Sequence, residues 1–178
     1  MSRIATGTGD KGETGLADGR RVRKTSLQIE AFGAVDELNA ALGVALAAGA
    51  PRKIASSLRR MQRELFDLGA DLSSAKGGPR LGKAHAQRLD AEIDVLEAVL
   101  PPLRRFVLPG GSPAGSHLHF SRTVCRRAER AVIRLREAEP DAVAPEAVVY
   151  LNRLSDLLFL MAREANHEAG VAESEVVF

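Results

Sequence analysis

The sequence predicts an all-α protein: a single domain in which five helices form a bundle behind a glycine-rich N-terminal loop, residues 1–25. Apolar residues make up 45% of the 178 positions, yet aromatic residues only 4%, and tryptophan is absent. A core of this composition must consist of Leu, Ala and Val, which suits helices better than a β-sandwich. After residue 25, apolar side chains recur at helical spacing in five segments separated by proline or glycine.

The first helix is predicted over residues 30–48, with Thr25 and Ser26 as candidate N-caps. A second face of this helix carries Asp36, Asn39 and Gly43. The apolar stripe consists of Ala34, Val35, Leu38, Ala41, Leu42, Ala45 and Leu46.

Pro51 marks the turn into the second helix, and residues 77–83 form a loop by composition. A third helix is predicted from about residue 84 until Pro101-Pro102 ends it. The second stripe consists of Ile54, Leu58, Met61, Leu65, Leu68 and Leu72, and the third of Leu89, Ile93, Leu96 and Leu100.

The fourth helix is predicted to begin with Ser112 as N-cap and Pro113 at its first position, and to end near residue 138. It has a strongly basic side, made up of Arg122, Arg126, Glu129, Arg130 and Arg134, with Arg127 further round. Such a row is often a solvated face. It is also suited to polyphosphate, because guanidinium groups match phosphate oxygens in bidentate geometry.

The fifth helix, residues 145–167, is apolar over most of its circumference and should be central. Asn152, Asp156 and Arg163 nevertheless share one stripe, with Phe159 beside them. Buried polar groups require partners. Two possibilities stay open, which are internal salt bridges of Asp36 or Asp156 with an arginine, and a ligand site.

Composition and spacing argue against several other functions. A net charge of +2 is too small for a general nucleic-acid or membrane surface, and no membrane span or signal peptide is seen, so a cytoplasmic location is predicted. The single cysteine, Cys125, lies on an apolar arc and is predicted to be core. His117 and His119 point about 160° apart on a helix, so we expect each to be exposed or hydrogen-bonded rather than to chelate a metal. Glu164 and His167 have di-iron spacing, but no second such pair exists.

The N-terminal stretch TGTGDKGETG has the composition of a phosphate-binding loop. Its glycines allow close backbone approach, and it carries hydroxyls and a lysine. It is not a Walker A loop, because Lys11 precedes Gly12 and no β-branched strand leads into it.

The chain resembles the ATP:cob(I)alamin adenosyltransferases of the propanediol-utilisation (PduO) type over almost its whole length. The resemblance rests on three blocks in order: TGTGDKGETGL…EAFGAVDELNAALG, RRFVLPGGSPAGSHLHFSRTVCRRAER and YLNRLSDLLFLMAREAN. It implies a homotrimer of five-helix bundles, with active sites between neighbouring subunits. It also implies transfer of the 5′-deoxyadenosyl group of ATP to cobalt, yielding adenosylcobalamin and triphosphate.

The resemblance implies roles for individual residues. Arg122 would pair with Asp36 across the interface, and these two would join Lys11 and Arg126 as the catalytic set. Phe106 would exclude water and the axial base from the lower face of the corrin, although its place after a proline-ended helix alone favours a core aromatic. Phe178 would also lie near the corrin. The ATP site would consist of Thr6, Gly7, Thr8, Gly9, Asp10, Lys11, Gly12, Thr14 and Lys24, with Arg126, Arg127, Glu129, Arg130 and Asn152 from the adjoining subunit.

The implied partners are ATP, Mg²⁺ bound through the ATP phosphates, cobalamin as substrate, an electron-donating reductase and an adenosylcobalamin-dependent mutase. No protein-bound metal, nucleic acid or membrane is expected. The alternative is a non-catalytic protein that binds ATP or corrinoid, or that delivers adenosylcobalamin. The intact set of Lys11, Arg126 and Asn152 favours the enzyme.

Overall fold

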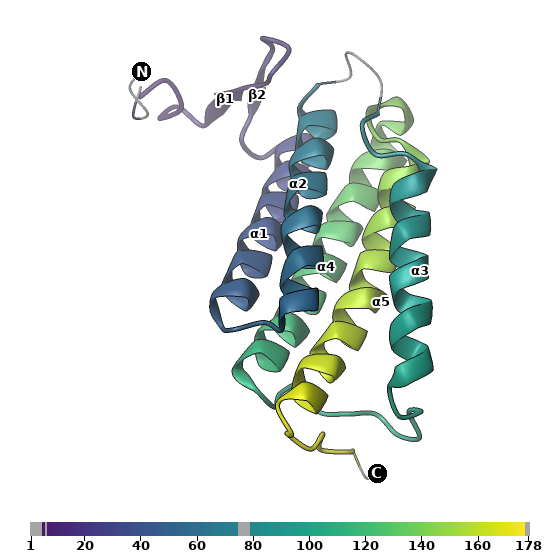
Figure 1. The fold of residues 1–178 in the computed structure, drawn as a ribbon. Helices are drawn as coiled ribbons and strands as arrows, with labels where there is room; N and C mark the ends of the chain where they lie inside the picture. Colours follow the sequence, from purple (N-terminus) through teal and green to yellow (C-terminus); the bar gives the residue numbers. More distant parts are fainter. Residues whose placement is uncertain (1–4, 6, 75–78, 177–178) are drawn as a thin grey trace.

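A computed structural model describes residues 5, 7–74 and 79–176 of the chain. In this part, five long helices run up and down in one bundle, which confirms the predicted fold class (Figure 1). The helices are α1 (Leu27–Ala47), α2 (Arg52–Ser73), α3 (Lys83–Val99), α4 (Pro113–Ala138) and α5 (Pro145–Glu168), with a short 3₁₀ turn, η1 (Pro140–Ala142).

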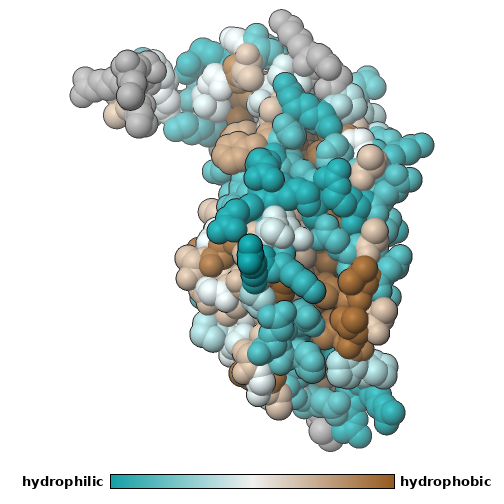
Figure 2. All heavy atoms as spheres, viewed as in Figure 1, coloured by the Kyte–Doolittle hydropathy of each residue, from teal (hydrophilic) through white to brown (hydrophobic). Residues whose placement is uncertain are grey.

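The core lies where α4 packs against α1 and α5, while α2 covers α1 and α3 covers α5. All six apolar residues predicted for the second helix are buried, as expected. In α3, by contrast, only Ala86 and Leu89 are buried, so this helix lies at the edge of the bundle. Figure 2 shows an apolar area over the lower part of α3, where Val95 and Val99 are exposed. No helix of the described residues is long and apolar enough to cross a membrane.

The caps follow the sequence. The hydroxyl of Ser26 accepts a hydrogen bond from the Ile29 amide at the start of α1, and that of Ser112 accepts one from the Gly115 amide at the start of α4, with Pro113 in the first helical position.

Asn166, near the end of α5, holds the segment that leads into α4. Its Oδ1 accepts hydrogen bonds from the backbone N–H of Ser112 at 2.9 Å and from the Ser112 hydroxyl at 3.0 Å, and its Nδ2 donates to the Gly110 carbonyl at 3.0 Å. A Cβ atom on Gly111 or Gly115 would lie only 2.4 or 2.1 Å from the Asn166 Oδ1. Gly111 also has φ +105°, which favours glycine.

The N-terminal segment corrects one expectation. We predicted a loop throughout residues 1–25, but β1 (Glu13–Gly15) and β2 (Arg21–Arg23) form an antiparallel hairpin. Its turn contains Asp18-Gly19, with Gly19 at φ +88° and the Asp18 side chain accepting the Arg20 N–H at 3.0 Å. An Asp-Gly pair is a hairpin signal in its own right.

After α5 the chain turns back along the segment between α3 and α4. The Leu108 N–H donates to the Ser174 carbonyl at 2.8 Å, and the Val176 N–H donates to the Phe106 carbonyl at 2.8 Å. Val107 and Glu175 thus form an isolated antiparallel bridge.

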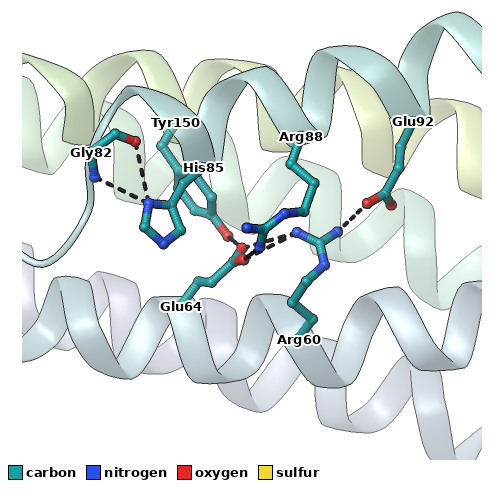
Figure 3. Close-up of polar contacts among 7 residues, drawn as sticks. All are labelled: Arg60, Glu64, Gly82, His85, Arg88, Glu92 and Tyr150. Carbon is teal, nitrogen blue, oxygen red and sulfur yellow. Dashed lines mark hydrogen bonds and ion pairs between the residues drawn. The ribbon is translucent and has the colours of Figure 1, made fainter.

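A charged network centred on the buried Glu64 carboxylate joins α2, α3 and α5 (Figure 3). The Glu64 carboxylate accepts hydrogen bonds from Arg60 at 3.1 Å, from Arg88 at 2.8 Å and from the Tyr150 hydroxyl at 2.8 Å, while Arg60 also contacts Glu92. Burial, followed by the Glu64 charge, raises the pKa of Tyr150, so the phenol keeps the proton that it donates. We call these five residues the Glu64 network.

Candidate functional site

The glycine-rich loop is a run of tight turns that ends in the hairpin. The Asp10 amide donates to the Gly7 carbonyl at 3.3 Å and the Gly12 amide to the Gly9 carbonyl at 3.2 Å. Gly7 and Gly12 have φ values of +69° and +83°, a conformation that glycine adopts without strain. The loop thereby exposes backbone and the Lys11 side chain to solvent.

Lys24 lies over this loop. A Cβ atom on Gly9 would be 3.1 Å from the Lys24 Nζ, and the Lys24 amide donates to the Gly12 carbonyl at 2.8 Å. A second cation is thus close to the glycines. Thr14 is half-buried in β1 and Thr8 is exposed. Thr6 lies outside the described residues.

A cleft opens beside α4, bounded by α5, α3 and the segment that follows α3. It comprises two adjoining cavities of about 860 and 410 Å³, which share Leu103, Arg122 and Phe159. The larger cavity is also lined by Phe106 and Val176, and the smaller by Arg126 and Asp156 among others.

Phe106 is not a core residue. The residue is 75% exposed at the larger cavity, so the core interpretation that its sequence position alone suggested is wrong. An exposed aromatic ring at the wall of a large cavity is available to a flat apolar ligand. Phe178 lies outside the described residues.

The basic side of α4 divides between two environments. Arg127 pairs with Glu37 at 2.6 Å, and Arg134 pairs with Glu30, both on α1. Arg122 and Arg126 instead line the cleft. The solvated-face interpretation therefore fits the first pair, whereas the second pair leaves its charge available in a cavity.

The polar stripe of the fifth helix finds its partners in different places. Asn152 donates to Glu129 at 3.1 Å and accepts from Arg153 at 3.0 Å. Arg163 is buried, and pairs with Glu173 at 2.9 Å. Asp156 is exposed in the cleft, and in the part of the chain that the structure describes no arginine pairs with it.

On α1, the side chains of the face that carries Asp36 and Asn39 also lie in two different environments. Asn39 exchanges hydrogen bonds with Gln62 of α2, its Nδ2 donating to the Gln62 carbonyl at 3.1 Å. Asp36 is exposed in a groove between α1 and α2 beside Phe32 and Phe66, and within the described ranges it has no arginine partner. Because Arg122 lines the cleft and Asp36 this groove, the two residues face different surfaces of one chain.

Sequence reasoning was wrong about His119. We expected it to be exposed or hydrogen-bonded, yet it is 2% exposed and neither ring nitrogen has a hydrogen-bond partner among the described residues. Its ring packs on Phe159, with the centroids 5.8 Å apart. Burial, followed by the charge of Arg122, lowers the pKa of His119, while Glu173 acts in the opposite direction.

Two further polar atoms near His119 have no partner in the described part of the chain, the Arg122 Nε and the Glu173 Oε1. Burial, followed by the neighbouring Arg126, lowers the pKa of Arg122. We call His119, Arg122, Arg163 and Glu173 the cleft cluster. The sequence analysis did not identify Glu173 as a site residue, because no motif or periodic pattern in the neighbouring sequence singles it out.

Cys125 is buried, as predicted, and its thiol donates to the Leu151 carbonyl at 3.2 Å. Burial raises its pKa far above the usual range, so it is not a nucleophile. Within the described residues no three His, Cys, Asp or Glu side chains converge on a metal position.

Known proteins resemble this chain over most of its length. A family model, cobalamin adenosyltransferase, matches residues 4–165. A corrinoid adenosyltransferase of Mycobacterium tuberculosis is 47% identical, the match covering 96% of this chain and 92% of that protein. A cobalamin adenosyltransferase of Cupriavidus metallidurans is 48% identical, with 96% and 91% covered.

Solved structures that resemble this chain come from the same family of enzymes. A Phe-to-His variant of a PduO-type ATP:corrinoid adenosyltransferase from Lactobacillus reuteri, complexed with cobalamin and ATP, superposes with a TM-score of 0.92 at 31% identity, covering 98% of this chain and 96% of that one. A Phe-to-Ala variant of the same enzyme, also with cobalamin and ATP, gives a TM-score of 0.90 at 30% identity, covering 99% and 100%. The chain belongs to the cobalamin adenosyltransferase family.

Proposed function

We propose that the chain transfers the 5′-deoxyadenosyl group of ATP to the cobalt of cob(I)alamin and releases triphosphate. The observation that carries this proposal is the cleft of this chain, which belongs to the cobalamin adenosyltransferase family. One end of the cleft exposes Phe106, and the other end exposes Arg126 and Asp156. An aromatic wall suits the corrin, and free guanidinium groups suit phosphate.

In the reaction, the electron pair of Co(I) attacks C5′ of ATP. The Co–C bond forms as the C5′–O bond breaks, and the triphosphate leaves with that bonding pair. Co(I) is a strong nucleophile and requires no general base. The protein must hold C5′ in line with cobalt and stabilise the charge that moves onto the triphosphate.

We assign the phosphates to the glycine-rich loop and the α4 arginines. Support comes from the close packing of Lys24 on Gly9 and from the absence of any ion pair of Arg126 within the described residues. Lys11 and Arg126 would stabilise the leaving triphosphate, with Asn152 and Glu129 placed by their mutual hydrogen bond. ATP would enter as its Mg²⁺ complex, with the metal held through phosphate oxygens.

Phe106 would act before the transfer. Co(II) must gain one electron from a reductase, and the axial base of cobalamin makes this difficult. A ring against the lower face of the corrin excludes the base and water and yields a four-coordinate Co(II) that is easier to reduce. The 75% exposure of Phe106 leaves the ring free for this contact.

We infer a homotrimer with sites between subunits. Two features support it: Asp36 and Arg122 lie on different surfaces of one chain, and Phe66 beside Asp36 is 71% exposed. A neighbouring subunit would bring the two charges together. Sedimentation analysis of Asp36→Arg should show loss of the trimer, and adding Arg122→Asp should restore it in part. The downstream partner would be an adenosylcobalamin-dependent mutase, and we place the enzyme in the cytoplasm.

The test is an anaerobic assay with ATP, Mg²⁺ and chemically reduced cob(I)alamin, following adenosylcobalamin by absorbance and triphosphate by chromatography. We expect one intact triphosphate for each adenosylcobalamin. Stabilisation by ATP without turnover would instead indicate a protein that binds or delivers the cofactor.

A further inference from the structure

Phe106 is placed by its backbone and not by its side chain. Because the residue is 75% exposed, little packing fixes the ring. The segment from residue 100 to residue 106 contains no helix or strand. Fixing a free backbone costs about 1–2 kcal/mol per residue, so other contacts must hold this segment in one conformation.

Those contacts come from the C-terminal segment, residues 171–176. Its Val176 N–H donates to the carbonyl of Phe106 itself, and its Ser174 carbonyl accepts from Leu108, both at 2.8 Å. The two bonds flank Val107, which bridges to Glu175. The backbone on both sides of Val107 is thus tied to the C-terminal segment.

The C-terminal segment is itself anchored by one arginine. Arg163 of α5 is 7% exposed. Its Nε donates to the Glu173 Oε2 at 2.9 Å, and its Nη2 donates to the Pro101 carbonyl at 2.9 Å. One rigid guanidinium therefore holds both ends of residues 100–106, which we call the Phe106 segment. It binds the beginning directly, at the Pro101 carbonyl, and it holds the end indirectly, through Glu173 and the C-terminal segment.

We propose that residues 171–176 form a strap that positions Phe106 in the cleft, and that Arg163 and Glu173 are the positioning residues that anchor it. The inference rests on the proposed function, because it gives Phe106 its task at the corrin. Hydrogen bonds between charged groups are the strong ones, and this pair is shielded from water. Without the anchor, the strap and the Phe106 segment should move together.

The experiment compares Glu173→Ala with a matched control, Glu175→Ala. Glu175 belongs to the same strap, but its carboxylate is exposed and lies 3.8 Å from Arg105. Three quantities are measured on each full-length protein: the ratio of four- to five-coordinate cob(II)alamin with MgATP by electron paramagnetic resonance, the Kd for ATP, and the hydrogen exchange of the Val176 and Leu108 amides.

For Glu173→Ala we expect faster exchange of both amides and a four-coordinate ratio lowered roughly tenfold, the factor that loss of one hydrogen bond to a charged group produces. The Kd for ATP and the transfer from chemically reduced cob(I)alamin should change less than about twofold, because neither depends on Phe106. Glu175→Ala should match the wild type in every quantity.

An unchanged four-coordinate ratio in Glu173→Ala would overturn the proposal, whether or not the amides exchange faster. If the unpaired Arg163 prevents folding of that variant, the double variant Glu173→Ala/Arg163→Met is read in the same way, since it removes the anchor without leaving a buried charge unpaired. Failure of the proposed function is distinguishable: the wild type would then not alkylate cob(I)alamin at all.

Discussion

The Glu64 network and the cleft cluster both bury charged side chains in the same bundle, but they differ in how completely their polar atoms are paired. Each Glu64 oxygen accepts from two donors. In the cleft cluster, both nitrogens of His119, the Arg122 Nε and the Glu173 Oε1 have no hydrogen-bond partner among the described residues. Buried polar groups are normally paired, so the exceptions call for an explanation. The first cluster is fully paired and should serve stability, whereas in the second Arg122 lines the cleft and should serve ligands, and the Arg163–Glu173 pair should hold the strap.

The largest expected effect is on the cleft side, at Arg126. Arg126→Ala should lower kcat by about 10²–10³-fold, the range for loss of one preorganised group that stabilises transition-state charge. Its thermal stability should be equal or slightly higher, because Arg126 repels Arg122. Steady-state kinetics and calorimetry check both parts. Arg126→Lys should recover only part of the rate, since lysine lacks the guanidinium fork; full recovery would contradict the proposed phosphate contact.

Glu64→Ala should show the opposite pattern. It leaves Arg88 and Tyr150 without their acceptor and Arg60 with Glu92 alone, and should lower the free energy of unfolding by about 3 kcal/mol, the low end for a broken buried pair because Arg88 is half exposed. Urea denaturation measures this. Glu92→Ala, in the same network, should cost less than about 1 kcal/mol. A loss of kcat in the folded fraction of Glu64→Ala would contradict the assignment of the Glu64 network to stability alone.

Phe106→Ala sharpens the comparison, because it changes the cleft without touching any buried polar group. The exposed ring contributes little to folding, so the free energy of unfolding should change by less than about 0.5 kcal/mol. The Kd for ATP should stay nearly the same, and four-coordinate Co(II) should disappear from the paramagnetic resonance spectrum. Retention of that species would remove Phe106 from the reduction step.

The smallest effect concerns His119 and pH. Its folded pKa is lowered from 6.5 by burial and Arg122, so below pH 6.5 the unfolded chain binds a proton that the folded chain does not. The free energy of unfolding should therefore fall as pH drops below 6.5, by at most about 1.4 kcal/mol per pH unit from this group. Urea titrations at pH 7.5 and 5.5 should show a smaller difference for His119→Leu than for the wild type. Equal differences would mean that Glu173 offsets burial.

The sequence predicted those features that depend on local pattern. The α2 stripe, the Ser26 and Ser112 caps and the five helices follow from periodicity and caps. The hairpin was missed although the Asp18-Gly19 pair indicates a turn. The flanking strands have only three residues each, which is too short for an alternating pattern to be recognised. Glu64 was missed because it lies beside Leu65 on an apolar stripe, where charge is unexpected.

Contacts between distant segments could not be predicted in this way. The pairing of Arg163 with Glu173 and of Phe106 with Val176 joins a helix and a loop to a tail without periodicity. Nor could helical spacing decide which arginines of α4 face α1 and which line the cleft, because both sets lie on one broad polar side. That choice depends on how α1, α3 and α5 surround α4, and the arrangement of neighbours is a property of the whole fold.

The contact of Asn166 with Gly111 and Gly115 sets a limit on how this protein can be redesigned. A library that varies the cleft to accept other corrinoids can change Leu103 or Val176, whose side chains line the cavity. It should leave both glycines fixed, since even an added methyl group would collide with the Asn166 side chain and shift the start of α4. Two arginines of the cleft wall, Arg122 and Arg126, lie further along that helix, so an added carbon atom at its beginning would displace both guanidinium groups from their places in the cleft.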